Sequence, residues 1–299
     1  MVDPTVVPSV VALDIGGTKM AAGLVDVTGR LRDRAVCATP ERGSADDMWR
    51  AVESLVAPLF ERASPVAIGV GCGGPMAAGG ITVSPLNIPA WRDFPLAARL
   101  GERFGVVVKV DNDAKALARA EGRWGAAVGC DDFIAMVVST GVGGGVVVDG
   151  RLLDGASGNA GHIGHVIVEP QGRECRCGAV GCLEAEASGT AIAEITGRPA
   201  REASRDDRRR CGRLVGRAVG SVANLLDLRL AVVAGSVALG FGADFFDAAQ
   251  DELDRTARLA FSRGARIVPA GCGDEGPLLG AAALALEVIG LGPVARPAA

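Results

Sequence analysis

The chain has 299 residues, with 49% hydrophobic and 22% charged side chains and a formal net charge of −4 at pH 7. This is ordinary globular material, long enough for one large domain or for two medium domains around a cleft. The negative charge argues against general affinity for nucleic acid or anionic membranes, although a local basic pocket is compatible with it.

The start of the chain has no features of a secretory signal. Residues Met1 to Pro4 lack a basic segment, and no apolar core segment follows them. The longest apolar run, Leu278 to Leu286, is too short to cross a bilayer. Outside one dense cluster the cysteines are scattered singly, which is typical of reduced thiols. We therefore expect a cytoplasmic protein without a membrane partner.

The first predicted element is a β-hairpin with a glycine turn. Apolar runs at Ser9–Leu13 and Met20–Val25 flank the sequence Asp14-Ile15-Gly16-Gly17-Thr18-Lys19. Paired glycines can form a simple tight turn, but bare backbone can also approach a phosphate closely. Because Asp, Thr and Lys lie beside the glycines, we interpret this turn as a candidate nucleotide site.

Helices and strands alternate after this hairpin. They are predicted at Ser44–Arg62 (helix, with Ser44 as N-cap), Val66–Val70 (strand), Leu96–Phe104 (helix), Val106–Val110 (strand) and Ala114–Trp124 (helix). Asn112 and Asp113 follow the second of these strands, and ligands bind at such strand ends in open α/β sheets. Asp113 is either the cap of the next helix or a general base. Lys115 is interpreted as a solvated helix residue.

A second hairpin repeats the pattern of the first. Strand-like runs at Phe133–Val138 and up to Val148 flank the glycine-rich sequence Ser139–Gly145. The following residues, Asp149 to Leu152, resemble Asp26 to Leu31 after the first hairpin. We interpret the repeat as an internal duplication that gives two similar domains facing each other across a cleft, with chance resemblance as the alternative.

Residues 158–184 form the most distinctive stretch of the chain. It holds His165, Cys175, Cys177 and Cys182, one imidazole and three thiols within eighteen residues. A closed tetrahedral zinc site needs four such ligands, because Zn²⁺ favours thiolate sulfur and imidazole nitrogen. Buried thiols beside a core histidine would be the simpler explanation, but the dense spacing favours zinc.

The remainder of the chain predicts an alternating α/β half. The expected elements are helices at Ala187–Thr196 and Ala203–Leu226, strand Leu230–Val233, the turn Ala234–Ala238, helix Ala243–Leu259, strand Arg266–Val268 and a last helix over Pro277–Val288.

Taken in order, these motifs resemble the ROK family of bacterial sugar kinases and repressors, within the hexokinase–actin–Hsp70 superfamily. The resemblance rests on Asp14–Lys19 and Ser139–Gly145 as phosphate motifs, Gly235 onward as an adenosine motif, Gly71–Pro75 as a hinge-proximal turn, Asn112-Asp113 as a sugar-binding pair, and Gly161–His165 with the three cysteines as a sugar and zinc signature. It implies two duplicated actin-like (ribonuclease H-like) α/β domains with a zinc loop. We place them at residues 1–113 and 114–299, and the last helix is free to pack back on the first domain.

The resemblance also implies ATP-dependent phosphorylation of a hexose hydroxyl, usually O6, with Asp113 as the catalytic base. The expected sugar contacts are Gly74, Asn87, Asn112, Asp113, His162, His165 and Glu184. The expected nucleotide contacts are Asp14, Gly16, Gly17, Thr18, Lys19, Thr140, Gly141, Gly143, Gly235 and Ser236. Mg²⁺ would be the catalytic metal and Zn²⁺ a structural one that fixes the sugar-binding loop. A homodimer is expected by analogy.

His162 departs from the family pattern, which usually has Glu at this position in contact with sugar hydroxyls. Imidazole replaces an obligate acceptor by a group that can donate or accept. The spacing of three residues would place His162 and His165 on one face of a helical turn. The substrate is therefore either glucose or an amino or otherwise modified hexose, such as the 3-amino sugar kanosamine.

Three alternatives remain open beside an ATP-dependent kinase. A repressor of this family needs a DNA-binding segment before the first hairpin, where this sequence has thirteen residues that read as a strand. A sugar-binding protein without catalysis is disfavoured by the presence of Asp113 and of both glycine turns. Polyphosphate could replace ATP as the phosphoryl donor.

Overall fold

The computed structural model describes residues 8–40 and 42–291. Contacts divide the chain into two compact units: the first comprises Met1–Trp124, Asp154–Asn159 and Asp274–Ala299, and the second Gly125–Leu153 and Ala160–Gly273. This division differs from the predicted one at residue 113. A helix that starts at Asp113 and the last helix of the chain both pack in the first unit, so the boundary cannot be drawn at one point of the sequence.

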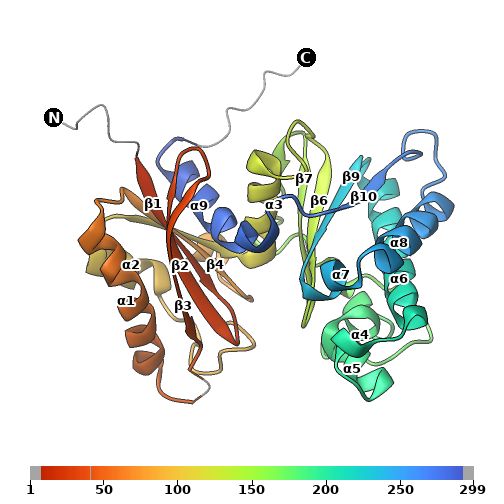
Figure 1. Ribbon diagram of the computed structural model, residues 1–299, viewed down its shortest axis with the longest axis horizontal. Helices are drawn as coiled ribbons and strands as arrows, with labels where there is room; N and C mark the ends of the chain where they lie inside the picture. The colour runs from red at the N-terminus through yellow and green to blue at the C-terminus, as the bar shows by residue number, and fades with distance from the viewer. Residues whose placement is uncertain (1–7, 41, 292–299) are drawn as a thin grey trace. The chain divides into compact units, whose positions relative to one another are not determined.

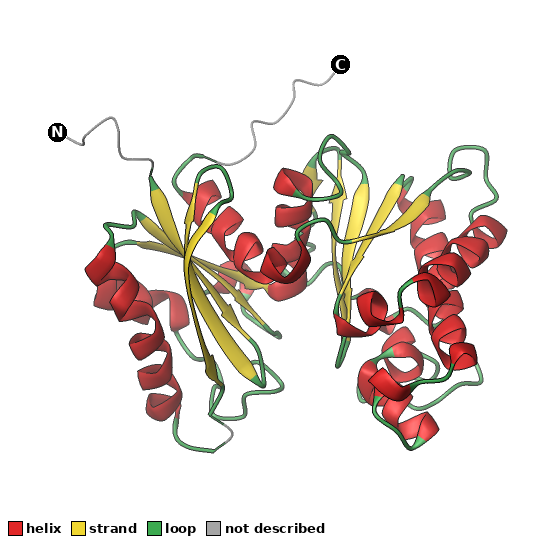
Figure 2. Cartoon of the chain, in the orientation of Figure 1, coloured by secondary structure: helices red, strands yellow, loops and turns green. Residues whose placement is uncertain are grey.

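The first unit is built on a five-stranded mixed sheet (Figures 1 and 2). Its strands are β1 (Ser9–Ile15), β2 (Lys19–Asp26), β3 (Leu31–Ala38), β4 (Ala67–Cys72) and β5 (Val107–Asn112), in the order β3-β2-β1-β4-β5. β1, β2 and β3 form an antiparallel meander, whereas β4 and β5 run parallel to β1. β4 is buried along its whole length, as a strand covered on both faces must be.

Helices cover both faces of this sheet (Figure 1). They are α1 (Ala45–Arg62), α2 (Leu96–Phe104), α3 (Asp113–Trp124) and α9 (Gly276–Val288). α1 begins where the sequence predicts, because Ser44 and Asp47 form a reciprocal capping box. α9 is apolar all round and packs against β1, β4 and α3, which explains why its residues from Leu278 to Leu286 are buried.

The second unit repeats this topology. Its strands are β6 (Phe133–Val138), β7 (Val142–Val148), β8 (Arg151–Leu152), β9 (Leu230–Ala234) and β10 (Arg266–Pro269), in the order β8-β7-β6-β9-β10. An antiparallel meander of three strands again continues into two parallel strands. The identical strand order in the two sheets is what an internal duplication predicts, and the predicted α/β class is confirmed.

The helices of the second unit are α4 (Leu183–Ala187), α5 (Gly189–Thr196), α6 (Arg205–Leu226), α7 (Ser236–Phe241) and α8 (Ala243–Thr256). The single helix expected over Ala187–Thr196 is wrong. Ser188 has extended backbone angles and caps α5 through its side chain, so two short helices meet there. α6 and α8 pack closely, because a Cβ added at Gly212 would lie only 2.2 Å from the carbonyl oxygen of Phe245.

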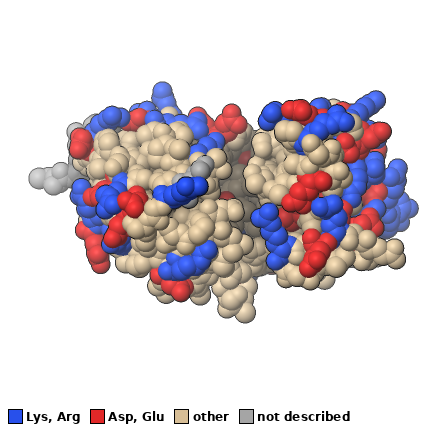
Figure 3. Space-filling view, turned by 90° about the horizontal axis from the view of Figure 1, so that it is seen from below, with Lys and Arg blue, Asp and Glu red and all other residues tan. Residues whose placement is uncertain are grey.

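Charged side chains of both signs are interspersed on the face drawn in Figure 3. Within residues 8–40 and 42–291, no helix combines the length and apolar character needed to span a membrane.

Candidate active site and metal centre

The turn between β1 and β2 is held by bonds to its own hairpin and to the end of β3. The amide of Gly16 donates to the carbonyl oxygen of Lys19 at 3.1 Å, and the hydroxyl of Thr39 donates to the carbonyl oxygen of Gly16 at 2.7 Å. A Cβ added at Gly17 would lie 2.6 Å from the Cβ of Asn87. The glycine turn therefore lies directly beside the Asn87 loop, and a side chain at residue 17 would displace it.

The predicted base lies where parallel strands of the first sheet end together. Asp14 is the last residue but one of β1, and Asp113 follows β5 as the first residue of α3. Between them, a Cβ added at Gly71 would lie 3.6 Å from the Cα of Asp113 and 3.8 Å from a carboxylate oxygen of Asp14. Asp113 is exposed, as a base that meets a substrate must be. Burial, and secondly the charge of Asp113, raise the pKa of Asp14 to about 7.

Asn112, rather than Asp113, acts as the main cap of α3. Its side-chain oxygen accepts hydrogen bonds from the amides of Ala114 and Lys115, at 3.0 and 3.4 Å. This fixes the amide nitrogen of Asn112 on the side of Gly74, where an added Cβ would lie 3.6 Å from it. Asp113 itself accepts a bond from the amide of Ala114 at 2.8 Å through one carboxylate oxygen. Both side chains thus bond the first amides of α3, and the role of Asp113 as a base stays a prediction.

Lys115 is not a solvated helix residue, contrary to the sequence-based expectation. It is buried, and its ammonium group lies 2.5 Å from a carboxylate oxygen of Asp154 and 3.3 Å from one of Asp111. Asp154 lies far along the chain from α3, so no local pattern in the sequence could have indicated this pair.

The second glycine turn, between β6 and β7, is held by Glu184. A carboxylate oxygen of Glu184 accepts a hydrogen bond from the amide of Val142 at 2.9 Å, and a Cβ added at Gly141 would lie 2.8 Å from it. Gly143 lies inside β7, opposite Val137 on β6. Glu184, predicted as a sugar contact, is thus also part of the support of the predicted phosphate turn.

The start of α7 meets this same turn. Gly235 has a φ of +100°, and a Cβ there would lie 2.3 Å from the carbonyl oxygen of Val138, so only glycine fits. The hydroxyls of Ser236 and Ser139 are 3.0 Å apart. The hydroxyl of Thr190, at the start of α5, donates to the carbonyl oxygen of the exposed Thr140 at 2.9 Å. The structure thus brings the second phosphate motif and the predicted adenosine motif together.

The two histidines lie at a short 3₁₀ turn, Ile163–His165. Both are exposed, and their ring centroids are 6.0 Å apart with the planes tilted by 31°. The turn is tightly packed against β7, because a Cβ added at Gly164 would lie 2.3 Å from the carbonyl oxygen of Val142. The backbone that carries both histidines is therefore held against β7.

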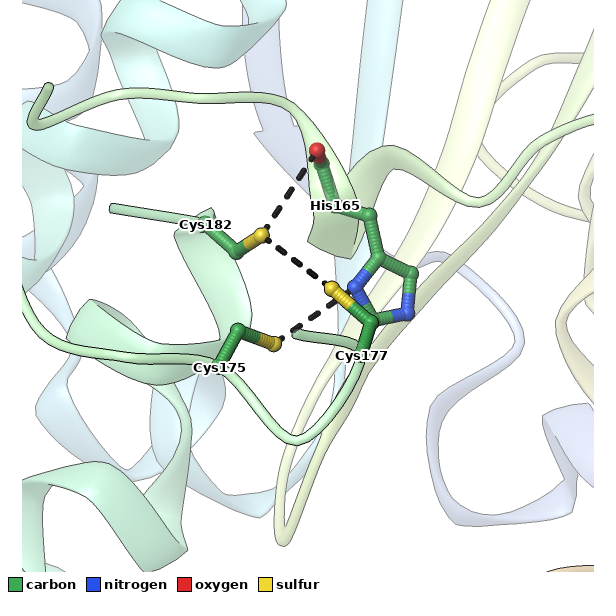
Figure 4. A group of neighbouring side chains, drawn as sticks. All are labelled: His165, Cys175, Cys177 and Cys182. Carbon is green, nitrogen blue, oxygen red and sulfur yellow. Dashed lines mark hydrogen bonds between the residues drawn. The ribbon is translucent and has the colours of Figure 1, made fainter. Parts of the chain in front are cut away.

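The four predicted zinc ligands converge. Figure 4 shows their side chains pointing toward one another, with Cys175 3.7 Å from Nδ1 of His165 and Cys177 3.7 Å from the sulfur of Cys182. All four ligand atoms lie within 4.8 Å of one another. A tetrahedron with zinc–sulfur bonds of about 2.3 Å has edges of about 3.8 Å, so the donor set fits zinc. Burial, foremost, raises the pKa of Cys182 to about 12, and a bound cation would favour its thiolate.

Glu186 anchors the cysteine loop and was missed in the sequence. Its buried carboxylate accepts a hydrogen bond from the amide of Arg173 at 2.6 Å and pairs with Arg210 on α6. A Cβ added at Gly172 would lie 2.4 Å from the same carboxylate. The loop that carries Cys175 and Cys177 is therefore tied to the core of the second unit.

Comparison with known proteins gives one family for nearly the whole chain. The model described as ROK family matches residues 10–288. The chain belongs to the ROK family. The family predicted from the motifs is therefore confirmed.

Several relatives of this ROK protein are named sugar kinases. An N-acetylmannosamine kinase from Escherichia fergusonii is 37% identical over 249 residues, which cover 77% of this chain and 84% of that protein. A crystal structure of a ROK family glucokinase from Streptomyces griseus, in complex with glucose and AMPPNP, matches with a TM-score of 0.81 at 32% identity, covering 93% of this chain and 99% of that one. A ROK hexokinase from Thermus thermophilus matches with a TM-score of 0.79 at 35% identity, covering 95% and 100%.

The predicted site residues of this ROK chain fall into two sets. The first unit brings together Asp14, Gly16, Gly17, Thr18, Lys19, Gly74, Asn87, Asn112 and Asp113. The second unit contains Thr140, Gly141, Gly143, His162, His165, Glu184, Gly235, Ser236 and the three cysteines of the metal centre. The residues that sequence reasoning missed, Thr39, Glu186 and Thr190, act through hydrogen bonds to backbone groups of these motifs.

Proposed function

We propose that this ROK protein is an ATP-dependent sugar kinase that transfers the γ-phosphoryl group to a hexose hydroxyl, with O6 as the expected acceptor. The observation that carries the proposal is the position of Asp113. Its exposed carboxylate lies at the carboxyl end of β5, beside Asp14 and on the same sheet as the glycine turn of β1 and β2. A base and a phosphate-binding turn at one sheet edge are what hydroxyl phosphorylation requires.

The chemistry assigns a role to each part. Asp113 accepts the proton of the attacking hydroxyl as its oxygen bonds to the γ-phosphorus, and the bond to ADP breaks with its electrons leaving on ADP. The backbone at Gly17 and the ammonium group of Lys19 hold phosphate oxygens, while the amide of Gly16 closes the turn by bonding the carbonyl oxygen of Lys19. Mg²⁺, when bound with the triphosphate, would neutralise part of the negative charge of the phosphate oxygens. Asn112 presents its amide nitrogen to a sugar hydroxyl, because its oxygen is occupied at the helix cap.

The metal centre fits a structural zinc ion rather than a catalytic one. Four protein ligands close a tetrahedral site and leave no position for water or substrate. His165 ends the 3₁₀ turn that His162 precedes as its N-cap, so a bound zinc would also hold the turn that is predicted to face the sugar. The zinc therefore supports sugar recognition without taking part in phosphoryl transfer.

Within the hexoses, we propose an amino hexose, free as in kanosamine or N-acetylated, in preference to glucose. His162 replaces the acidic residue that is usual in the family, and a neutral imidazole can accept a hydrogen bond from a sugar nitrogen or donate one to an acetyl oxygen. The named relatives include kinases of N-acetylmannosamine and of glucose, so both classes belong in a test.

The test is a panel of sugars and donors with the purified protein. Glucose, mannose, N-acetylmannosamine, N-acetylglucosamine and kanosamine are each incubated with ATP or polyphosphate, and the phosphorylated position is read by ³¹P and ¹³C NMR. We expect an O6-phosphorylated amino hexose formed from ATP, and no product with Asp113→Asn. Calorimetric binding of a sugar without any turnover would instead indicate a binding protein, and turnover with polyphosphate alone would change the donor.

A further inference from the structure

Lys115 of α3, two residues after Asp113, is buried. Only 3% of its side chain is exposed. A lysine ammonium group has three hydrogens and is costly to bury unless each finds a partner. Three acceptors surround it: a carboxylate oxygen of Asp111 at 3.3 Å, one of Asp154 at 2.5 Å, and the carbonyl oxygen of Gly158 at 3.3 Å.

Two of these acceptors belong to one short segment, Asp154–Asn159, which we call the tether segment. It packs in the first unit although the residues on both sides of it belong to the second. It carries no regular secondary structure, and its side chains from Asp154 to Ser157 are exposed. Gly158 also lies beside the 3₁₀ turn Ala78–Gly80, because an added Cβ would lie 3.5 Å from the Cα of Ala78. The tether segment has little apolar burial to hold it in place.

The two carboxylates that contact Lys115 differ in how much they depend on it. Asp111 does not depend on Lys115, because its other oxygen pairs with Arg119 at 2.9 Å and Arg119 also pairs with Glu287 of α9. Asp154 is different: its side chain is 70% exposed and its ion pair is with Lys115, while Arg119 and Lys109 act on it only as weaker charges. The hydrogen bond from Lys115 is the main cause that lowers the pKa of Asp154. Asp111 and Arg119 are paired without Lys115, whereas the exposed Asp154 has its ion pair with Lys115. The lysine therefore serves mainly to bind the tether segment.

We propose that Lys115 is a positioning residue that fixes the tether segment to α3, the helix that begins with Asp113. The residues that follow the tether segment in the chain are Ala160 to His165, which carry both histidines of the protein. Lys115 thus fixes the segment of the first unit from which the stretch with both histidines continues along the chain. The kinetic consequence of this role rests on the proposed sugar kinase function.

The contact is tested with Lys115→Met and Asp154→Ala, separately and together. Methionine keeps the length of the side chain in the buried site but removes the charge. Hydrogen–deuterium exchange is measured by mass spectrometry on peptides that cover the tether segment and residues 160–165. We expect exchange there to rise about tenfold in both single variants, with no further rise in the double variant, because all three lose the same contact. This measurement needs no catalytic activity.

The kinetic arm uses the sugar from the panel that gives turnover. KM for the sugar is expected to rise about tenfold in both single variants, with a smaller change in kcat, because the base itself stays in place. Lys109→Met is the matched control: Lys109 lines the same small cavity as Lys115 and also acts on Asp154 by its charge, but it forms no ion pair among the described residues, so the variant removes a charge without removing the contact. It should leave KM and exchange unchanged.

The outcomes separate the two proposals. If the wild-type protein phosphorylates no sugar, the proposed function fails, and the exchange measurement still decides the role of Lys115. If exchange in the tether segment and KM both stay at wild-type values while only the thermal midpoint of Lys115→Met falls, Lys115 serves stability alone and the inference is overturned. Additive effects in the double variant would also contradict it, since they would show that the two side chains act separately.

Discussion

The carboxylate of Glu184 accepts a hydrogen bond from the backbone amide of Val142 at 2.9 Å, which ties the start of α4 to the turn between β6 and β7. Glu184 is a predicted sugar contact, whereas the turn is a predicted phosphate contact. One carboxylate therefore connects the two proposed ligand regions of the second unit.

Replacing Glu184 should consequently affect both substrates. We expect Glu184→Ala to raise KM for ATP and for the sugar by about tenfold each, because a hydrogen bond to a charged group is lost and the turn loosens. Glu184→Gln keeps an oxygen acceptor for the amide of Val142, so KM for ATP should return close to the wild-type value. Steady-state kinetics in both substrates give the answer. If Glu184→Ala alters KM for the sugar but not KM for ATP, the hydrogen bond from Val142 to Glu184 does not support the turn between β6 and β7.

The role of Asp113 is tested by Asp113→Asn. Asparagine keeps the oxygen that accepts the bond from the amide of Ala114, so the helix start should be unchanged. Loss of the base should lower kcat by about 10²–10⁴. The dissociation constant of the sugar, measured by calorimetry, should stay within about threefold of the wild-type value. Near-normal turnover would mean that Asp113 does not accept the proton.

One tightly bound zinc ion per chain is expected at His165, Cys175, Cys177 and Cys182. Elemental analysis of protein purified without added metal should find it. Cys177→Ser should lose the metal, lower the thermal midpoint and weaken sugar binding, because the ligands organise the loop around them. Cys130→Ser, outside the ligand set, serves as the control. Full activity and stability in metal-free protein would contradict the zinc assignment.

The buried carboxyl of Asp14 should give the free protein a pH-dependent stability. Its pKa is raised from 3.8 to about 7, so between these values the folded chain keeps a proton that the unfolded chain has lost. The free energy of unfolding therefore falls as the pH rises through this window, by up to about 1.4 kcal/mol for each pH unit from this group. Asp14→Asn should remove that slope. The free energy of unfolding of the variant, relative to that of the wild type, should therefore be higher at about pH 8 than at about pH 5.

Urea unfolding at the two pH values checks this expectation. Asp131→Asn, at an exposed position in the second unit, is the control for a general change in net charge. If the difference between Asp14→Asn and wild type is the same at both pH values, Asp14 titrates no differently in the folded and unfolded chains.

The role of His162 in sugar recognition is tested by the variant His162→Glu. Restoring the carboxylate that is usual in the family should shift preference toward glucose, because a mismatched sugar leaves a buried polar group unpaired at about 1–3 kcal/mol. The measurement is kcat/KM for glucose and for an amino hexose, in the wild type and in the variant. His162→Gln, which keeps a donor and an acceptor without a charge, is the comparison. An unchanged ratio between the two sugars would place His162 outside the recognition site.

Local sequence patterns predicted much of the fold. α2 and β6 have the predicted bounds, and α1 begins at its predicted cap, because capping residues and apolar periodicity act over a few neighbouring positions. The break between α4 and α5 was missed, since Ser188 acts as a cap only when its backbone is extended. The convergence of the zinc ligands followed from their spacing within one loop.

Features that join distant segments could not be predicted in this way. Lys115 looks like any exposed lysine of an amphipathic helix until Asp154, 39 residues later, is brought to it. Glu186 reads as one acidic residue among several, but it closes the cysteine loop by binding a backbone amide and Arg210. The division into units likewise depends on contacts between segments far apart in sequence.

The return of α9 to the first sheet has a consequence for how the chain is made. On the ribosome, β1 and β4 emerge before the second unit, whereas the helix that covers them, Gly276–Val288, is synthesised only after it. Until then the apolar faces of these strands lack their main cover, and the nascent first unit exposes a surface prone to aggregation. The two halves should therefore mature in reverse order, with the second sheet complete before the first, and nascent chains stalled before residue 276 should depend on chaperones.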